Sequence, residues 1–330
     1  MTFFAPYAEQ AADRRTVLVT GATGVVGSAL LPRLAATHRV IALAHRRITP
    51  GGVVTVHGDV TRPLLGLARD RYAALAERVE VIVHAAADTE PASTGYQPNV
   101  VGTRHVLDLA EASGATVHFL SPAATHRGAG SNYLRGKRIA EQLVRDSGVP
   151  ATIVRPSAVI GDAQTGEIAA FRGISALTAA VLGSAMPVLP LDPRDRIDTV
   201  PVDVLARTLA SLVDSGTAAG EYWITAGSAA LTAERWLEIL VDVGDRLGIP
   251  VTPPRLHRPG RLLPSLAPYA DPDVLPSDLA TLPGGTVLGP QQTACAVEAS
   301  ATYLACAKGM LPLADLAPRV RTRRRALAAA

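Results

Sequence analysis

Short apolar runs alternate with amphipathic stretches along the first half of the chain. Thr16–Thr20, Arg39–Ala44 and Thr116–Leu120 are apolar and rich in β-branched residues, which is typical of strands buried on both faces. Further strands are predicted over 53–56, 79–84 and 151–155. Helices are predicted from the glycines after the first strand to Ala36 and over 70–78, 99–113 and 133–147. This alternation indicates βαβ units and predicts an α/β fold with a doubly wound parallel sheet.

The second half of the chain has a different pattern. After Gly161, proline and glycine become frequent, and longer loops separate the helical stretches. We therefore expect a core over 16–160 and a smaller C-terminal substrate-binding lobe over 161–330, with segments around 196–226 returning to the core. Residues 1–15 are expected to be a leader. The apolar range 175–191 contains Gly183 and Pro187 and is short for a bilayer span, so it predicts a core helix followed by a turn.

Composition and charge exclude several classes of protein. Hydrophobic residues make up 48% of the chain and charged residues 18%, which excludes disorder. The net charge is +3 with no basic stripe of interleaved aromatics, so we expect no nucleic-acid partner, and the basic run Arg319–Arg325 is interpreted as a solvated tail. The chain does not open with a basic and then an apolar segment, so we expect a cytoplasmic protein. Cys295 and Cys306 suit neither a disulfide framework nor a metal site, and both are predicted to be buried free thiols.

A glycine-rich turn follows the first predicted strand. The segment Thr20–Gly27 (TGATGVVG) ends a buried strand and opens a helix. Glycines permit a tight turn and a close approach to a pyrophosphate, and the helix N-terminus offers free N–H groups to it. This context predicts a dinucleotide-binding Rossmann core. The residues predicted to line the phosphate site are Gly21, Thr23, Gly24, Val25, Val26 and Gly27.

The ends of the next strands predict the preference among dinucleotides. The second strand ends in His45-Arg46-Arg47, and arginines there suit a 2′-phosphate, whereas a carboxylate would hold a ribose 2′-hydroxyl. We therefore predict NADP (NADPH) rather than NAD, with Arg46 ranked above Arg47. Asp59 and Val60 follow the third strand and are predicted to meet the adenine. The small residues that leave room for the cofactor after the fourth strand are Ala85, Ala86 and Ala87.

Together these segments resemble the extended short-chain dehydrogenase/reductases, as do the ranges 99–103 (NVVGT), 133–137 (YLRGK) and 155–156 (RP). Three more ranges are similar to the thioester reductase branch: 58–67 (GDVTRPLLGL), 161–166 (GDAQTG) and 200–203 (VPVD). That branch includes fatty acyl-CoA reductases and the reductase domains of carboxylic acid reductases and some nonribosomal peptide synthetases. The resemblance covers about residues 16–230. It implies an NADP-dependent oxidoreductase, with Pro156 among the residues that contact the cofactor.

The resemblance makes Tyr133 and Lys137 the catalytic pair. They are four residues apart and share one face of a helix. An ammonium group near Tyr133 favours the phenolate and lowers a pKa that is normally about 10, so that Tyr133 can serve as a proton donor at neutral pH. Lys137 is also expected to bind the cofactor through its ribose hydroxyls. Asn99 has two compatible interpretations. The resemblance implies that it kinks its helix and supports the active-site lysine through water, and its place before Val100 suits a helix N-cap.

The chain departs from the family pattern at the end of the fifth strand. An ungapped alignment places the family's catalytic serine or threonine at Pro122, which has no hydroxyl. Ser121 is the first candidate to replace it, and Thr125 is the second. Ten residues separate Pro122 from Tyr133, which is short for the family and predicts an open site for a bulky or carrier-bound substrate. His126 and Arg127 lie in this segment, either facing solvent or touching substrate.

Three functions are compatible with these residues. The first is an NADPH-dependent reductase that converts an acyl thioester, on coenzyme A or a carrier protein, to an aldehyde or alcohol. The second is another extended-family reaction, either reduction of a ketone, imine or aldehyde or a sugar-nucleotide conversion. The third is a non-catalytic NADP-binding protein, which Pro122 favours and the Tyr133–Lys137 pair opposes. A monomer and a homodimer are both left open, and no membrane span is expected.

Overall fold

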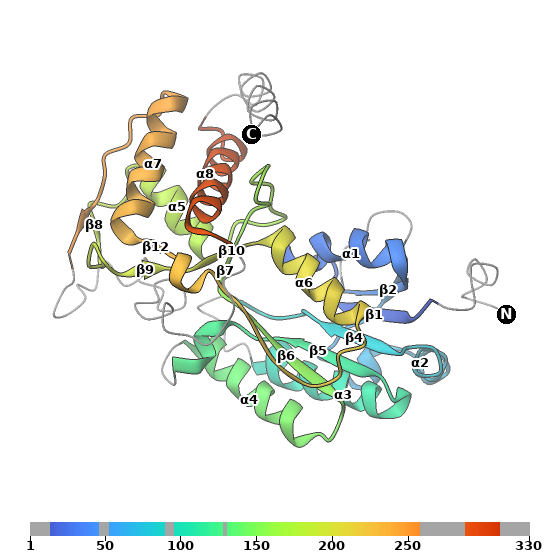
Figure 1. The fold of residues 1–330 in the computed structure, drawn as a ribbon. Helices are drawn as coiled ribbons and strands as arrows, with labels where there is room; N and C mark the ends of the chain where they lie inside the picture. Colours follow the sequence, from blue (N-terminus) through green and yellow to red (C-terminus); the bar gives the residue numbers. More distant parts are fainter. Residues whose placement is uncertain (1–13, 46–52, 90–95, 128–130, 258–287, 311–330) are drawn as a thin grey trace. The chain divides into compact units, whose positions relative to one another are not determined.

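A seven-stranded sheet is the central element of the computed structural model, which describes residues 14–45, 53–89, 96–127, 131–257 and 288–310 (Figure 1). Its strand order is β11-β6-β5-β4-β1-β2-β3. The strands are β1 (Thr16–Thr20), β2 (Arg39–Ala44), β3 (Val54–His57), β4 (Val81–His84), β5 (Thr116–Leu120), β6 (Ala151–Pro156) and β11 (Gly220–Ile224). The pairs from β3 to β5 are parallel. The predicted α/β class and parallel sheet are confirmed.

The strand order reverses between β1 and β4. The chain moves from β1 outward to β2 and β3, then returns to the other side of β1 to place β4 and β5. In open α/β sheets, ligands bind outside the carboxyl ends of the strands at such a reversal. The paired residues at this edge are Thr20 and His84, and then His84 and Phe119. We therefore expect the functional site to lie around these strand ends.

Helices cover both faces of the sheet (Figure 1). One face carries α1 (Val25–Thr37) and the part of α6 (Val202–Asp214) that packs with it. His38, which follows α1, forms a hydrogen bond with Asp214 at the end of α6. The other face carries α2 (Arg69–Ala76), α3 (Gly102–Ser113) and α4 (Asn132–Asp146). Apolar side chains such as Leu18, Ile82, Leu109 and Phe119 fill the space below that face. Because both faces are covered, β1, β2, β4 and β5 are buried almost throughout, which explains their continuous apolar runs.

The chain divides into two compact units. The first comprises residues 1–120, 136–153 and 206–221, and the second comprises 121–135, 154–205 and 222–330. The strands and α-helices confined to the second unit are β7 (Ala158–Ile160), α5 (Ile174–Leu182), β8 (Val188–Leu189), β9 (Arg196–Ile197), β10 (Thr199–Pro201), β12 (Leu231–Thr232), α7 (Ala233–Leu247), β13 (Arg255–Leu256) and α8 (Pro290–Ala307). The predicted division near residue 160 stays a prediction.

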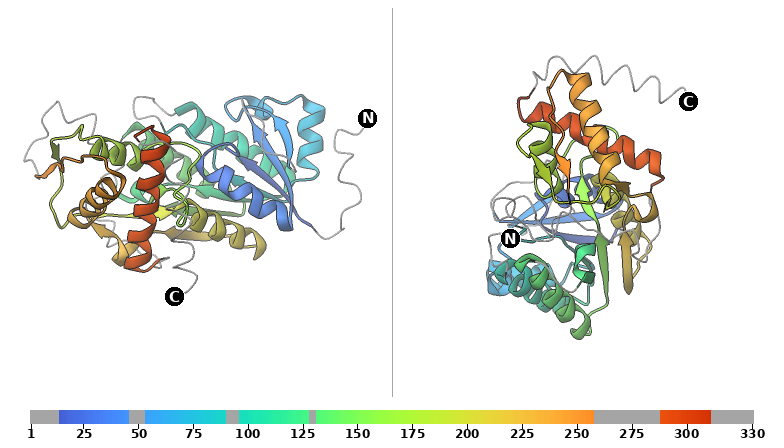
Figure 2. Two further views of the ribbon diagram at one scale, coloured as in Figure 1. Left: turned by 90° about the horizontal axis from the view of Figure 1, so that it is seen from above. Right: turned by 90° about the vertical axis from the view of Figure 1, so that its left-hand side faces the viewer.

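The core of the second unit lies among α5, α7 and α8, which Figures 1 and 2 show packed together. Trp236 is its largest fully buried side chain, and Leu182, Leu240 and Val297 pack in the same core. The apolar range 175–191 forms α5 followed by a turn into β8, as predicted. The buried side of α5 explains why this stretch is so apolar.

Two cysteines lie on α8 in different surroundings. Cys306 is buried as predicted, but the prediction for Cys295 was wrong, because Cys295 is exposed. The buried side of α8 carries Thr293, Ala296, Val297 and Ala301 at helical spacing, and Cys295 falls outside that stripe. It lines a groove of about 500 Å³ between α7 and α8. An alanine-rich segment hides this asymmetry, since alanine occurs on both faces of the helix.

Several sequence predictions fall outside the described residues. These are the leader up to residue 13, Arg46, Arg47 and the basic run Arg319–Arg325. Within the described ranges, no helix has the length and apolar character needed to cross a bilayer. The same ranges contain no cluster of three or more His, Cys, Asp or Glu residues suited to a metal ion.

A glycine contact in the second unit gives a test of its packing. Gly166 has φ of 72°, and a Cβ added there would overlap the backbone carbonyl of Ala299 on α8. We expect Gly166→Ala to destabilise the protein by roughly 1–3 kcal/mol from the overlap, in addition to about 1–2 kcal/mol for the left-handed conformation. Gly248→Ala is the matched control, because Gly248 has φ of 70° and open space around the added Cβ. Equal losses in urea unfolding would contradict the close packing of Gly166 on α8.

Candidate active site

The glycine-rich turn between β1 and α1 has the geometry of a phosphate cradle. Gly21 has φ of 68°, and a Cβ there would lie 2.6 Å from the backbone of Ala85 and Ala86. Gly24 N–H donates to Gly21 O at 2.9 Å, which closes the turn. An added Cβ on Gly27 would overlap Gly21 O, so glycine lets α1 sit directly on the turn. Only glycine satisfies the positive φ and these close approaches together.

The start of α1 fits a dinucleotide pyrophosphate. Its N-cap is Gly24, which supplies no side-chain hydrogen bond, and the first turn holds no acidic residue. The first N–H groups of α1 and the positive end of its dipole are therefore not opposed by a carboxylate of that turn. The predicted residues are distributed as follows: Gly21, Thr23 and Gly24 in the turn, Val25, Val26 and Gly27 in the first turn of α1, Asp59 and Val60 after β3, Ala85, Ala86 and Ala87 after β4, and Pro156 at the end of β6.

Asp59 is anchored by its own loop. Its Oδ1 accepts from Thr61 N–H at 2.9 Å and from Thr61 Oγ1 at 2.7 Å. The loop then turns through Leu64 and Leu65, both in the left-handed region at φ of 55° and 56°, and Asp59 N–H donates to Leu65 O. Burial raises the pKa of Asp59, but the bonds from Thr61 and the charges of His45 and Arg62 outweigh it, so the pKa lies below its ordinary value. The ionised carboxylate is thus held by Thr61, and the strained leucines fix the backbone of the same loop.

His84 connects the elements that meet at the reversal of the sheet. It is completely buried, its Nδ1 lies 2.7 Å from Thr20 Oγ1, and its Nε2 lies 3.1 Å from Thr103 Oγ1. Thr103 Oγ1 donates its single proton to Asn99 O at 2.7 Å, so toward His84 it can only accept. The proton of the neutral ring is therefore on Nε2, and Nδ1 accepts from Thr20. Ala86 N–H in turn donates to Thr20 Oγ1 at 3.3 Å.

Asn99 lies in a π turn, η3 (Gln97–Val101), that leads into α3. The prediction of an N-cap was wrong, because helical backbone already precedes Asn99. Its side chain bonds outside the helix instead, accepting from Asp88 N–H at 2.9 Å and donating to Asp88 O at 3.0 Å. This pair of bonds fixes the loop that follows β4. The role of Asn99 in supporting the active-site lysine stays a prediction.

Lys137 is a buried cation at the carboxyl end of β5. Its side chain is 2% exposed, its Nζ donates to Leu120 O at 2.9 Å, and it lies 4.6 Å from the centroid of the Phe119 ring. Burial lowers the pKa of Lys137 to about 8, although the carboxylate of Glu141 raises it. Tyr133, one helical turn earlier on α4, is half-buried. The predicted pair thus lies on one helix, with its lysine desolvated.

The use of lysine at position 137 is itself informative. The chain contains 32 lysine and arginine residues together, and only Lys137 and Lys308 are lysines. Arginine would keep its charge at any pH and presents a broad planar fork, whereas an ammonium is compact and can change its pKa on burial. A chain that uses arginine almost everywhere uses lysine where the buried cation approaches Leu120 O.

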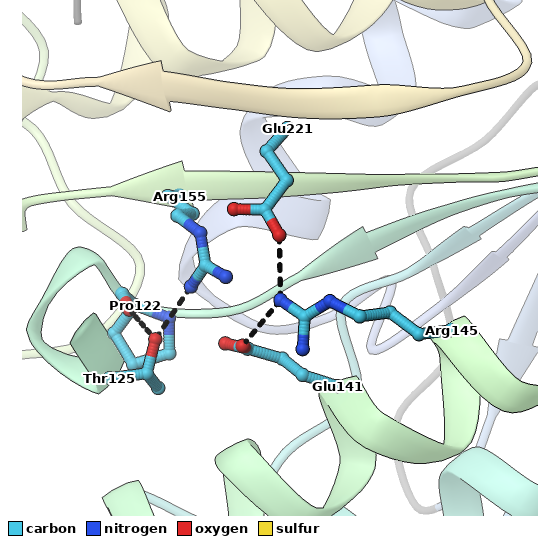
Figure 3. Close-up of polar contacts among 6 residues, drawn as sticks. All are labelled: Pro122, Thr125, Glu141, Arg145, Arg155 and Glu221. Carbon is cyan, nitrogen blue, oxygen red and sulfur yellow. Dashed lines mark hydrogen bonds and ion pairs between the residues drawn. The ribbon is translucent and has the colours of Figure 1, made fainter. Parts of the chain in front are cut away.

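The two candidates for the missing hydroxyl have different surroundings. Thr125, in the turn η4 (Ala123–Arg127), donates to Pro122 O at 2.8 Å and accepts from the Arg155 guanidinium at 2.6 Å (Figure 3). Its only proton is therefore committed to the backbone. Arg155 is 3% exposed and lies 5.1 Å from the Trp223 ring, against which His126 packs edge-on. Ser121 is buried where β5 ends, and its N–H donates to Val154 O.

Sequence reasoning missed two participants in this arrangement. Arg155 belongs to the Arg155-Pro156 motif of the family resemblance, but nothing in its spacing indicates that it forms a hydrogen bond with Thr125. Glu141 was not identified, although it stands four residues after Lys137, the same spacing that joins Tyr133 to Lys137. That repeated interval was the available signal for Glu141. Contacts between distant segments, such as Thr20 with His84, cannot be predicted unless the strand order is known.

Comparisons with known proteins give a matching family model and several curated relatives. A family model described as Male sterility protein matches residues 48–129 and 121–209. Glycine betaine reductase ATRR of Emericella nidulans is 29% identical over 257 residues, which cover 61% of this chain and 20% of that protein. Ceramide reductase of Caulobacter vibrioides is 31% identical over 207 residues, which cover 60% of this chain and 61% of that protein. The chain therefore spans less than two thirds of either relative.

The fold has a close counterpart among solved structures. The terminal R domain from the myxalamid PKS-NRPS biosynthetic pathway matches with a TM-score of 0.68 and 21% identity, covering 91% of this chain and 92% of the other. These matches confirm the resemblance to the extended short-chain dehydrogenase/reductases. Within this class, its matches are to the male sterility family and to terminal reductase domains, which confirms the resemblance to the thioester reductase branch.

The tautomer of His84 gives a test of this network. Burial, and secondarily the charge of Lys137, lowers the pKa of His84 to about 3. We expect long-range ¹H–¹⁵N correlations to show a neutral ring with the proton on Nε2 from pH 8 down to pH 5. Because the unfolded ring protonates near its ordinary pKa of 6.5, the stability that His84 contributes is complete above that pH and is lost as pH falls toward 3.

A Thr103→Val variant is the control for the tautomer. It removes the acceptor of the Nε2 proton while preserving the shape of the side chain, so the preference for Nε2–H should weaken. A ring that protonates near pH 6.5 in the wild type, or that carries its proton on Nδ1, would contradict the assignment.

Proposed function

We propose that this protein is an NADPH-dependent reductase of acyl thioesters carried on coenzyme A or on a carrier protein, with an aldehyde or alcohol as product. The observation that carries the proposal is the desolvated ammonium of Lys137, one helical turn from Tyr133, at the carboxyl edge where the strand order reverses. The similarity to a PKS-NRPS terminal R domain supports the choice of thioester over other carbonyl compounds.

The residues of the chain have distinct tasks in this scheme. The cradle from Gly21 to Gly27 binds the pyrophosphate, and Arg46 and Arg47 would select the 2′-phosphate of NADPH. The bound cofactor supplies the hydride. Tyr133 polarises the substrate oxygen and gives it a proton, and the charge of Lys137 favours the phenolate that remains. The resulting hemithioacetal loses the carrier thiol as its C–S bond breaks and gives the aldehyde. An alcohol would require a second NADPH and a second proton. Asn99 and the bonds of His84 keep the loop after β4 in position.

The second oxygen donor in this scheme is Ser121. Since the proton of Thr125 is committed to Pro122 O, Thr125 has none to offer a substrate oxygen. In this scheme the donor hydroxyl lies one residue before Pro122, at Ser121. The hydrogen bond between Arg155 and Thr125 holds the turn that follows Pro122. The short segment to Tyr133 leaves room for a carrier-bound chain delivered by a partner protein in the cytoplasm.

A second candidate function is reduction of a ketone or aldehyde. The similarity to a ceramide reductase favours it, since that relative also matches over 60% of this chain. The same Tyr133 and Lys137 would serve, because proton donation to a carbonyl oxygen is common to both reactions. The substrates differ in the group that the second unit must accommodate.

A panel of substrates separates these functions. We expect NADPH oxidation at 340 nm with acyl-pantetheine thioesters, a much weaker rate with NADH, and a loss of at least about 10²-fold in Tyr133→Phe because the proton donor is removed. Tyr222→Phe is a control, since Tyr222 lies on β11 outside the proposed catalytic group. Turnover of ketones or aldehydes alone would establish the second function. Tight NADPH binding with no turnover would support a non-catalytic protein instead.

The choice between the hydroxyl groups makes a separate prediction. Ser121→Ala should lower kcat by about 10²–10³-fold, since it removes a donor to the developing oxyanion. Thr125→Val should lower the melting temperature, because it leaves Pro122 O and the buried Arg155 without their hydroxyl partner, and should affect kcat less. The reverse pattern would assign the donor to Thr125.

A further inference from the structure

Four polar residues follow one another along α4 at intervals of four. Each of Tyr133, Lys137, Glu141 and Arg145 therefore lies beside the next on the helix surface, and their charges alternate after the phenol. Tyr133 and Lys137 have a task in the proposed function. Glu141 and Arg145 have none there, although they continue the same stripe.

Glu141 is buried and held in place. It is 4% exposed, and Arg145 Nη2 donates to its Oε2 at 3.3 Å. The same nitrogen donates to Glu221 Oε1 on β11 at 2.6 Å, as Figure 3 shows. The side chains of Arg145 and Glu221 are about 40% exposed, at 42% and 39%. Arg145 and Glu221 thus form an ion-pair bridge that is exposed to water at one end and contacts the buried carboxylate of Glu141 at the other. The bridge fixes that carboxylate one helical turn from Lys137.

Burying an ammonium favours its neutral form, so Lys137 needs partners that stabilise its charge. Leu120 O accepts from it, and the Phe119 ring faces it with the negative side of its π system. His84, on β4, is neutral and offers no anion. On α4 itself the titratable neighbours are Tyr133 and Glu141. Of these two, Glu141 is the group that carries a negative charge at neutral pH.

We propose that Glu141 is a positioning residue, whose buried carboxylate keeps Lys137 in its ammonium form at neutral pH and is itself fixed by Arg145 and Glu221. The inference rests on the proposed function, because a charged Lys137 matters through its effect on Tyr133. Burial lowers the pKa of Lys137 to about 8 with Glu141 opposing the change, so the charge of Lys137 is lost as pH rises through about 8. Without Glu141, that loss moves to lower pH.

The lysine content of the chain makes a direct titration possible. With ¹³C-labelled lysine, the protein gives signals from Lys137 and Lys308 alone, and Lys308 is exposed and serves as an internal reference. In Glu141→Gln, we expect the midpoint of Lys137 to fall by about 1–3 pH units, the size of effect that a close charge has on a buried group. Asp146→Asn is the matched control, since it removes an exposed carboxylate from the same helix. Its Lys137 midpoint should not move.

A second variant makes the opposite prediction. Arg145→Gln removes the cation that partly neutralises Glu141, so the midpoint of Lys137 should rise. A merely structural role for the bridge predicts no such opposite shifts. An unchanged Lys137 midpoint in either Glu141→Gln or Arg145→Gln would overturn the proposal, and the Arg145→Gln measurement decides the matter if Glu141→Gln fails to fold.

Kinetics then connect the shift to the reaction. In Glu141→Gln, the alkaline limb of the kcat/KM profile should move to lower pH by the same amount as the Lys137 midpoint, and Glu141→Asp should restore part of it. The ¹³C titration needs no substrate or cofactor. If thioesters are not reduced but Lys137 shifts as expected, the proposed function fails while the inference about Glu141 stands.

Discussion

The hydrogen bond between Thr20 and His84 joins the two strands at which the sheet reverses. Thr20 is the last residue before the glycine-rich turn, and His84 is the last residue before the loop that contacts Gly21. The imidazole continues through Thr103 to the π turn that holds Asn99, and Asn99 bonds back to Asp88. The buried imidazole of His84 therefore fixes the positions of the phosphate turn, the loop after β4 and the start of α3 relative to one another.

The neutrality of His84 has a consequence for Lys137. Two cations buried side by side would repel, and the charge of Lys137 already contributes to the low pKa of His84. Because the threonines satisfy both nitrogens of a neutral ring, His84 can fill the space beside Lys137 without adding charge. A neutral His84 therefore adds no second positive charge beside the ammonium of Lys137. The electric field of that ammonium acts on the face of α4 that carries Tyr133. Burial makes that field stronger than it would be in water.

The sequence contained enough to predict the sheet but not the polar connections across it. Thr16–Thr20, Arg39–Ala44 and Thr116–Leu120 occur as strands with the predicted bounds, since strands covered on both faces leave a continuous apolar run. The pair Tyr133–Lys137 came from the family resemblance, and helical spacing added only that the two residues share a face. Asn99 was misassigned as an N-cap because its real partner, Asp88, lies across a loop and not along the helix. Cys295 was misassigned because an alanine-rich helix does not reveal which face is buried.

Pro122 shows how a departure from a motif can be absorbed by its surroundings. A proline in this position supplies no donor, but its carbonyl remains, and Thr125 uses its hydroxyl to bind that carbonyl. The buried guanidinium of Arg155 then needs an acceptor and finds it in the same hydroxyl, while the face of Trp223 stabilises its charge. The hydrogen bonds of Thr125 thus link Pro122 O to the buried guanidinium and help to hold the turn in one conformation. The hydroxyl of Thr125 is thus engaged in holding the turn that Pro122 begins.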